Sequence, residues 1–163
     1  MIFRLAKENE KEIVLNLYKT VLGEENCVWD ECYPSYLEVE EDYKANNLFV
    51  LEENNEIIAA ISIVSKNEMD NFNEWKYTNN VSEIARVIVR KDKRGQNLSI
   101  IMLDNISEIL INRGKNVIHL AVAIKNKAAV KNYIKYGFEI IAKKFMYNNE
   151  YYLCEKNIGD KNE

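Results

Sequence analysis

Apolar residues along the chain follow two spacings, one typical of amphipathic helices and one typical of short strands. The helical spacing is strongest from Leu98 to Gly114, where one face stays apolar until the glycine. It also predicts helices from Glu8 to Leu22 and from Asn126 to Tyr136, and a short helix after the loop within residues 26–47. Compact apolar runs predict seven strands, Ile2–Ala6, Leu48–Leu51, Ile57–Val64, Ser82–Val89, Asn116–Val122, Phe138–Lys143 and Tyr147–Cys154.

These elements follow one another as strand, helix, helix, three strands, helix, strand, helix and two strands. Strands that follow each other directly predict antiparallel hairpins, whereas a helix between two strands predicts a crossover connection. The order therefore predicts an α/β protein of the mixed α+β kind, with a central sheet and helices on both sides.

Length and charge narrow the class of protein. The 163 residues suffice for one domain with its own core, so we expect a single domain over residues 1–163, with 158–163 as a frayed tail. The formal net charge of −4 argues against nucleic acid as a partner. No run of about 18 apolar residues occurs, and the opening MIFRLAKENEKE lacks the apolar segment of a signal peptide. We therefore expect a cytoplasmic protein with no membrane partner.

The three cysteines do not predict a metal or redox site. Cys27 and Cys32 lack the two-residue gap of a zinc or redox pair, and Cys154 lies far along the chain. Since the chain has a single histidine, His119, it offers no credible set of metal ligands. We expect three reduced thiols and no metal cofactor.

A basic loop joins the strand that ends at Val89 to the helix that begins at Leu98. It reads Arg-Lys-Asp-Lys-Arg-Gly-Gln-Asn. A helix N-terminus exposes unpaired N–H groups that favour phosphate, and Gly95 lets the backbone approach a ligand. By itself, however, such a loop is more often a solvated basic turn, so both interpretations stay open here.

Two segments together resemble the acetyl-CoA-binding pattern of the GNAT superfamily of N-acetyltransferases. The first, EIARVIVRKDKRGQNLSIIML, is similar to the family's strand, its R/Q-x-x-G-x-G/A loop and its helix. The second runs from Asn126 through Tyr133 to Gly137 and Phe138 and resembles the family's closing Asn, Ala, Tyr and Gly-Phe pattern. The resemblance covers nearly the whole chain. It implies the GNAT fold, a central, mixed, mostly antiparallel sheet of about seven strands flanked by about four helices.

The loop departs from the family pattern at both small-residue positions. Arg94 matches, but Asn97 stands where the family has glycine and Ser99 where it has glycine or alanine. Asparagine tolerates left-handed backbone angles better than most residues, and a serine hydroxyl can donate a hydrogen bond to phosphate. We therefore expect coenzyme binding to survive, with a degenerate site as the alternative.

The resemblance implies a coenzyme site along the strand, the loop and the following helices. The backbone of Val87 and Val89 would bond the pantetheine arm, and the loop amides would hold the pyrophosphate. Asn126 would reach the pantetheine or the sulfur end, or would serve as a plain helix N-cap. The residues implied to bind the coenzyme are Val87, Ile88, Val89, Arg94, Gly95, Gln96, Asn97, Leu98, Ser99, Asn126 and Tyr133.

Amine acetylation requires two proton transfers, one from the acceptor ammonium and one to the leaving thiolate. The resemblance places Tyr133 as the general acid, with a packed helix aromatic as the alternative. It places Glu83 as the base, acting directly or through water, with a solvated strand residue as the alternative. An acyl-enzyme on Cys154 is not expected, because no residue is placed to activate that thiol. The resemblance implies direct attack on the thioester.

Aromatic and acidic residues outside the motifs suggest where the acceptor binds. The aromatic candidates are Trp29, Tyr33, Tyr36, Trp75 and Tyr77, and the acids are Asp30, Glu31, Glu38, Glu40, Glu41 and Asp42. This combination suits a cationic amine, with core packing for the tryptophans and a solvated helix face for the acids as the alternative. Arg86 either binds a substrate carboxylate or pairs with a glutamate.

The sequence thus predicts an acetyl-CoA-dependent N-acetyltransferase acting on a primary amine of a small molecule, a peptide or a protein. Following the habit of the family, we also expect a homodimer. A non-catalytic acyl-CoA-binding or sensor domain is the second hypothesis, since both small loop residues are replaced. A plain protein-interaction domain that binds no coenzyme is the third.

Overall fold

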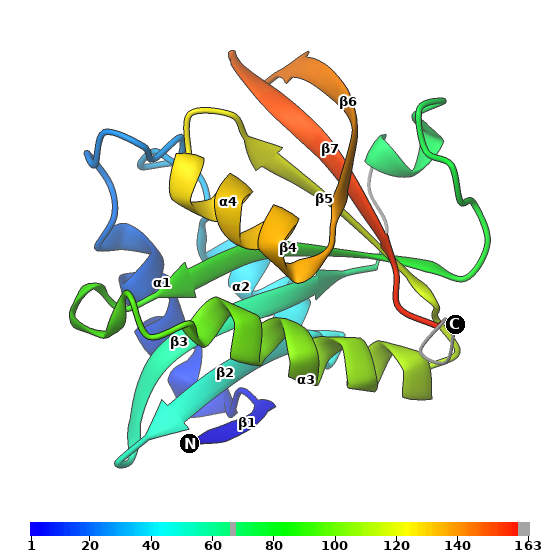
Figure 1. Cartoon of the computed structure of the whole chain (residues 1–163). Helices are drawn as coiled ribbons and strands as arrows, with labels where there is room; N and C mark the ends of the chain where they lie inside the picture. The colour runs from blue at the N-terminus through cyan, green and yellow to red at the C-terminus, as the bar shows by residue number, and fades with distance from the viewer. Residues whose placement is uncertain (66–67, 160–163) are drawn as a thin grey trace.

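The computed structural model describes residues 1–65 and 68–159 and shows one seven-stranded sheet with helices on both faces (Figure 1). The strands are β1 (Ile2–Leu5), β2 (Leu48–Glu53), β3 (Glu56–Val64), β4 (Val81–Val89), β5 (Val117–Ala123), β6 (Glu139–Met146) and β7 (Asn149–Asn157). The helices are α1 (Lys11–Lys19), α2 (Tyr36–Lys44), α3 (Leu98–Asn112) and α4 (Lys127–Tyr136), with 3-10 turns η1 (Glu8–Glu10), η2 (Glu68–Asn71) and η3 (Lys91–Lys93).

The strands lie in the order β1-β2-β3-β4-β5-β7-β6. Every neighbouring pair is antiparallel except β4 and β5, which run parallel. The predicted fold class and element order are confirmed, as is a mixed, mostly antiparallel sheet flanked by four helices. In the parts of the chain that the structure describes, no helix is long and apolar enough to cross a membrane.

Local sequence explains most element boundaries. Ser35 and Glu38 form a capping box that starts α2, with the Ser35 N–H donating to Glu38 Oε1 at 2.6 Å. Gly114 adopts a φ of 83° just beyond α3, the left-handed conformation that stops a helix. The final hairpin differs from its prediction, because Tyr147 and Asn148 have φ of 51° and 63° and form the turn rather than the start of β7.

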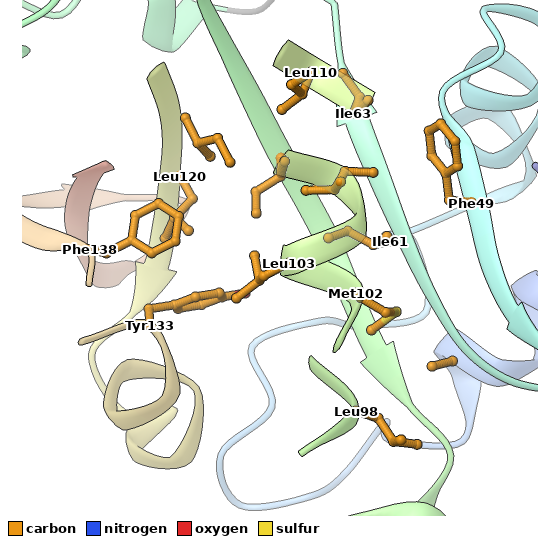
Figure 2. Close-up of a cluster of buried hydrophobic side chains, with 14 of the residues drawn as sticks. Phe49, Ile61, Ile63, Leu98, Met102, Leu103, Leu110, Leu120, Tyr133 and Phe138 are labelled. Carbon is orange, nitrogen blue, oxygen red and sulfur yellow. The ribbon is translucent and has the colours of Figure 1, made fainter. Parts of the chain in front are cut away.

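The sheet separates the apolar core into two layers. The larger cluster lies between the sheet and the helices α3 and α4, with Met102, Leu103 and Leu120 among its members (Figure 2). The second lies under α1 and α2, and a separate, smaller cluster surrounds Trp75. The predicted frayed tail differs at its start, because Ile158 is buried and its N–H donates to Asn116 O at 2.8 Å. Residues 160–163 of that tail lie outside the described residues.

Candidate functional site

Strands β4 and β5 diverge within the sheet and leave a gap. They pair only over Val81–Glu83 and Val117–His119, and beyond that point they separate toward their C-terminal ends (Figure 1). The Arg90 N–H donates to Ile58 O of β3 at 2.8 Å. Since backbone groups alternate along a strand, the N–H groups of Val89 and Val87 point the other way, into the gap. These are the two residues predicted to bond an extended ligand.

The basic loop lies at the open end of this gap and leads into α3. Gly95 and Asn97 adopt φ of 81° and 59°, so two loop residues have left-handed backbone conformations before the helix begins at Leu98. Asn97 accepts the conformation expected of it, in the place where the family pattern has glycine. Its side chain does not cap α3, which leaves the first N–H groups of the helix open to an anionic ligand.

The basic side chains of the loop are held by nearby carboxylates. Glu24, from the connection between α1 and α2, accepts from Lys91 Nζ at 3.1 Å and from Arg94 Nη2 at 3.2 Å. Arg90 pairs with Asp92 at 2.7 Å, and Lys93 pairs with Glu53 at 2.8 Å. An anionic ligand would therefore have to compete with Glu24 for Lys91 and Arg94.

The start of α4 carries the second predicted group of residues. The Asn126 side chain accepts from the Ala129 N–H at 3.3 Å, so its role as helix N-cap is present. One turn of helix beyond Ala129, the Tyr133 side chain is buried and its ring packs edge-on against Phe138. Figure 2 shows Tyr133 extending from α4 toward Leu103 of α3. Burial, together with the nearby Cys154, raises the pKa of Tyr133, so its phenol keeps its proton throughout the neutral range.

Cys154 of β7 is placed as an inert core residue. Only 1% of its surface is exposed, and burial raises the pKa of its thiol to about 12. A thiol that stays protonated is a poor nucleophile, which agrees with the expectation that no acyl-enzyme forms on it.

Glu83 lies on β4 at the point where the two strands separate. It is 8% exposed, so it is a buried carboxylate and not the solvated strand residue considered as its alternative. Its strand neighbours are Val64 of β3 and His119 of β5. Ile84, the next residue, packs in the larger core beneath α3, so Glu83 faces the opposite side of the sheet.

A bulge in β4 turns Arg86 toward α2. The pairing with β3 shifts register here, and Arg86 has a φ of 53°. Its guanidinium is buried against the Asp42 carboxylate and donates through Nη1 to the Tyr33 hydroxyl at 2.8 Å. Arg86 thus pairs with an acid, as one of its two predicted roles requires, although the acid is an aspartate. Sequence analysis did not connect Asp42 with Arg86.

The two tryptophans pack into the protein. Trp75 is 7% exposed, and its ring stacks on the His119 imidazole with 3.6 Å between centroids. Trp29 is partly buried and packs edge-on against Tyr18. Both occupy the core positions considered as the alternative to acceptor binding, whereas Tyr33 is 41% exposed and stays available to a ligand.

Sequence analysis missed a buried polar pair next to Glu83. His119 Nε2 lies 2.7 Å from Glu155 Oε2, and both side chains are almost fully buried. The available signal was a histidine flanked by Ile118 and Leu120 in an otherwise apolar strand, since alternation places it on the opposite face from its neighbours.

Sequence comparison agrees with this geometry. Residues 14–138 match the model of the acetyltransferase (GNAT) family, which is most of the chain. The chain therefore belongs to the GNAT acetyltransferase family. A search of curated protein sequences found no match.

Solved structures share the fold over almost their entire length. An acetyltransferase of the GNAT family from Streptococcus agalactiae superposes with a TM-score of 0.81 at 16% identity, covering 96% of this chain and 94% of that one. The yncA acetyltransferase of Salmonella typhimurium, solved with its cofactor acetyl-CoA, gives 0.77 at 16% identity over 98% and 95% of the two chains. A spermidine N-acetyltransferase chimera from Vibrio cholerae gives 0.69 at 18% identity over 97% of each.

Proposed function

We propose that this protein transfers an acetyl group from acetyl-CoA to a primary amine by direct attack in a ternary complex. The observation that carries the proposal is the left-handed loop at Asn97, which opens the N-terminus of α3 at the mouth of the gap between β4 and β5. Phosphate and an extended amide-bearing arm are the two parts of the coenzyme that such a mouth and gap suit.

The residues around the gap fit this coenzyme. The loop amides from Arg94 to Ser99 would bind the pyrophosphate, and the N–H groups of Val87 and Val89 would pair with the pantetheine arm. Asn126 stands at the start of α4 on the other side of the mouth. Acetyl-CoA supplies an activated thioester, so the protein has to position it and manage protons.

In this proposal, Glu83 is the base and Tyr133 is the acid for the two proton transfers. Glu83 takes the proton from the acceptor ammonium, directly or through a water molecule, and so frees the nitrogen lone pair. The nitrogen–carbon bond forms as the carbonyl becomes an oxyanion, which a backbone N–H of the Val87–Val89 segment stabilises. Tyr133 then donates its proton to the thiolate as the carbon–sulfur bond breaks, and the second proton that the product nitrogen loses restores the Tyr133 phenol. The protonated state of Tyr133 suits this role.

Negative charge favours a cationic acceptor on the side of the sheet that carries Glu83. Glu155 also lies buried on this side, and the exposed Tyr33 lies beside Arg86. Because Asp42 already holds Arg86, this arginine is a weaker candidate for binding a substrate carboxylate. A small-molecule amine and the amine of a peptide or protein both suit this environment.

A non-catalytic acyl-CoA-binding domain is the second candidate. The observation that favours it is the pairing of Glu24 with Lys91 and Arg94, which offsets one of the two positive charges at the loop. Such a domain would bind the coenzyme without releasing thiol.

Thermal unfolding with and without acetyl-CoA, followed by thiol release, separates the candidates. Ligand at 100 times its Kd should raise the midpoint by about 5–10 °C, while ATP, as a control for phosphate alone, should give a smaller shift. Free thiol released with a panel of primary amines supports the enzyme. A midpoint shift without thiol release from any amine favours the binding domain, and no shift at millimolar acetyl-CoA contradicts both.

A further inference from the structure

Three buried ionisable side chains form one row across the centre of the sheet. Glu83 of β4 is the register partner of His119 of β5, and His119 is the register partner of Glu155 of β7. Their exposed fractions are 8%, 5% and 3%. Adjacent strands are about 5 Å apart, so the strand on each side of His119 carries a buried glutamate at the register position of the histidine.

The imidazole is fixed in place by its other neighbours. Its Nε2 lies 2.7 Å from Glu155 Oε2, and that oxygen also accepts the Tyr77 N–H at 3.0 Å. The Trp75 ring covers the imidazole at 3.6 Å and is itself anchored by its Nε1–H donating to Met69 O at 2.8 Å. Stacking and hydrogen bonding together therefore fix the orientation of the imidazole ring.

The charges facing His119 come from three elements. Among the residues that the structure describes, Glu155 on β7 and Asp70 on η2 act on the imidazole electrostatically, and Glu83 on β4 is its register partner. The exposed Lys76–Glu139 pair lies farther out beyond Glu155. Burial lowers the pKa of His119, although Glu155 opposes the shift. The ring is then neutral near pH 7, donates its Nε2–H to Glu155 and leaves Nδ1 without a proton.

The row can hold a proton more easily than a single buried carboxylate. A proton in this row can be shared between an imidazole and a carboxylate, whereas a proton on a single buried carboxylate has only one acceptor. The Oε1 atom of Glu155 is buried and has no hydrogen-bond partner among the described residues, so this oxygen can stabilise a nearby positive charge.

We infer that His119, held by Glu155 and Trp75, is a positioning residue that acts through Glu83 by sharing the proton taken from the acceptor. This inference rests on the proposed function. The proton leaves the ammonium for the Glu83 carboxylate and passes to His119 Nδ1, directly or through one water. The imidazolium is stabilised by Glu155 and returns its proton to solvent once the product has left. No oxidant or further reactant is required.

The single histidine of the chain allows a direct test by NMR. Labelled His119 gives one imidazole signal, whose titration is followed in the wild type and in Glu83→Gln. Loss of the neighbouring negative charge should lower the titration midpoint of His119 by at least about 0.5 pH unit. The matched control is Glu139→Gln, because Glu139 is the register partner of Glu155 in the same row but has a side chain that is 61% exposed. It should leave the midpoint unchanged.

Kinetics provide the second test. His119→Gln keeps a donor for Glu155 but cannot take a proton, so kcat should fall about tenfold or more, with the KM for acetyl-CoA unchanged. The acidic limb of the pH–rate profile should move to lower pH, which a purely structural role would not cause. Glu83→Asp, which keeps the charge, serves as a second variant if Glu83→Gln does not fold, and should preserve the His119 titration.

The outcomes separate this inference from the proposed function. An unmoved His119 midpoint in Glu83→Gln, an imidazole that takes up no proton above pH 4.5, or an unmoved acidic limb in His119→Gln overturns the inference even if amines are acetylated. Absence of thiol release by the wild type with every amine overturns the proposed function instead, whatever the NMR titration shows.

Discussion

Arg86 and Asp42 form a buried, bidentate ion pair that joins the bulge of β4 to α2. Arg86 Nη2 donates to Asp42 Oδ1 at 3.0 Å and to Oδ2 at 2.8 Å, and its Nε donates to Oδ2 at 3.2 Å. The two side chains are only 9% and 7% exposed. Because Tyr33 also accepts from Arg86, the pair fixes the bulge of β4 relative to both α2 and the loop before it.

Breaking this pair should destabilise the fold. Asp42→Asn leaves the Arg86 charge buried without its counter-ion, which should lower the free energy of unfolding by about 3–5 kcal/mol. Urea denaturation followed by circular dichroism measures the loss. The control is Asp92→Asn at the exposed Arg90 pair, which should leave the denaturation midpoint essentially unchanged. Equal midpoints for the two variants would contradict the prediction.

Removing the Tyr133 hydroxyl should slow the reaction without weakening coenzyme binding. Tyr133→Phe removes the proton donor that we propose for the leaving thiolate, so kcat should fall by about 10–1000-fold while the Kd for acetyl-CoA stays the same. Thiol-release assays measure kcat, and calorimetric titration measures the Kd for acetyl-CoA. Tyr136→Phe is the control on the same helix, since the Tyr136 hydroxyl donates to Asp104 at 2.9 Å, and it should be nearly as active as the wild type. Equal rates for both variants would remove Tyr133 from the mechanism.

The left-handed conformation of Asn97 should make coenzyme binding sensitive to the residue at this position. Asn97→Ala places an ordinary side chain at a φ of 59°, which costs about 1–2 kcal/mol and should weaken acetyl-CoA binding by about fivefold to thirtyfold. Asn97→Gly removes the steric cost and should bind at least as tightly as the wild type. Calorimetric titration with acetyl-CoA ranks the three proteins, and an alanine variant that binds as well as the glycine variant would show that the turn is not needed.

Cys154 should resist alkylation at pH values where an ordinary thiol reacts. Burial raises the pKa of its thiol to about 12, so the thiolate appears only as the pH approaches that value. At pH 8 about one molecule in ten thousand carries it. Iodoacetamide followed by mass spectrometry should therefore modify the exposed Cys32 and leave Cys154 intact until the protein is unfolded. Rapid labelling of Cys154 in the folded protein would reopen the covalent route.

The order of elements could be predicted because each has its own local signal. Apolar spacing marks α3, Asn126 and Gly137 bound α4, and the turn at Asn54 and Asn55 separates β2 from β3. These signals lie within a few residues of the structure they specify, so they need no knowledge of the tertiary fold.

The polar partners within the sheet could not be predicted, because they depend on register. Glu155 follows His119 by 36 residues, and only the antiparallel pairing of β5 with β7 makes the two neighbours. Likewise, Arg86 reaches Asp42 because of a bulge, and a shift by one residue would turn its side chain to the other face. The family motifs identified Glu83 and Tyr133 by position, but they carried no information about what surrounds those side chains.

The gap between β4 and β5 is closed at one end, and this determines how far a linear molecule can enter. An open sheet edge usually accepts a strand of any length, which is why exposed edges invite aggregation. Here the two edges converge at Glu83 and His119, so an intruding polypeptide could not run through. A tethered arm held by its charged end at the α3 loop would instead be stopped at a fixed depth. The convergence of β4 and β5 at Glu83 and His119 would thus limit how far the end of such an arm can reach into the sheet.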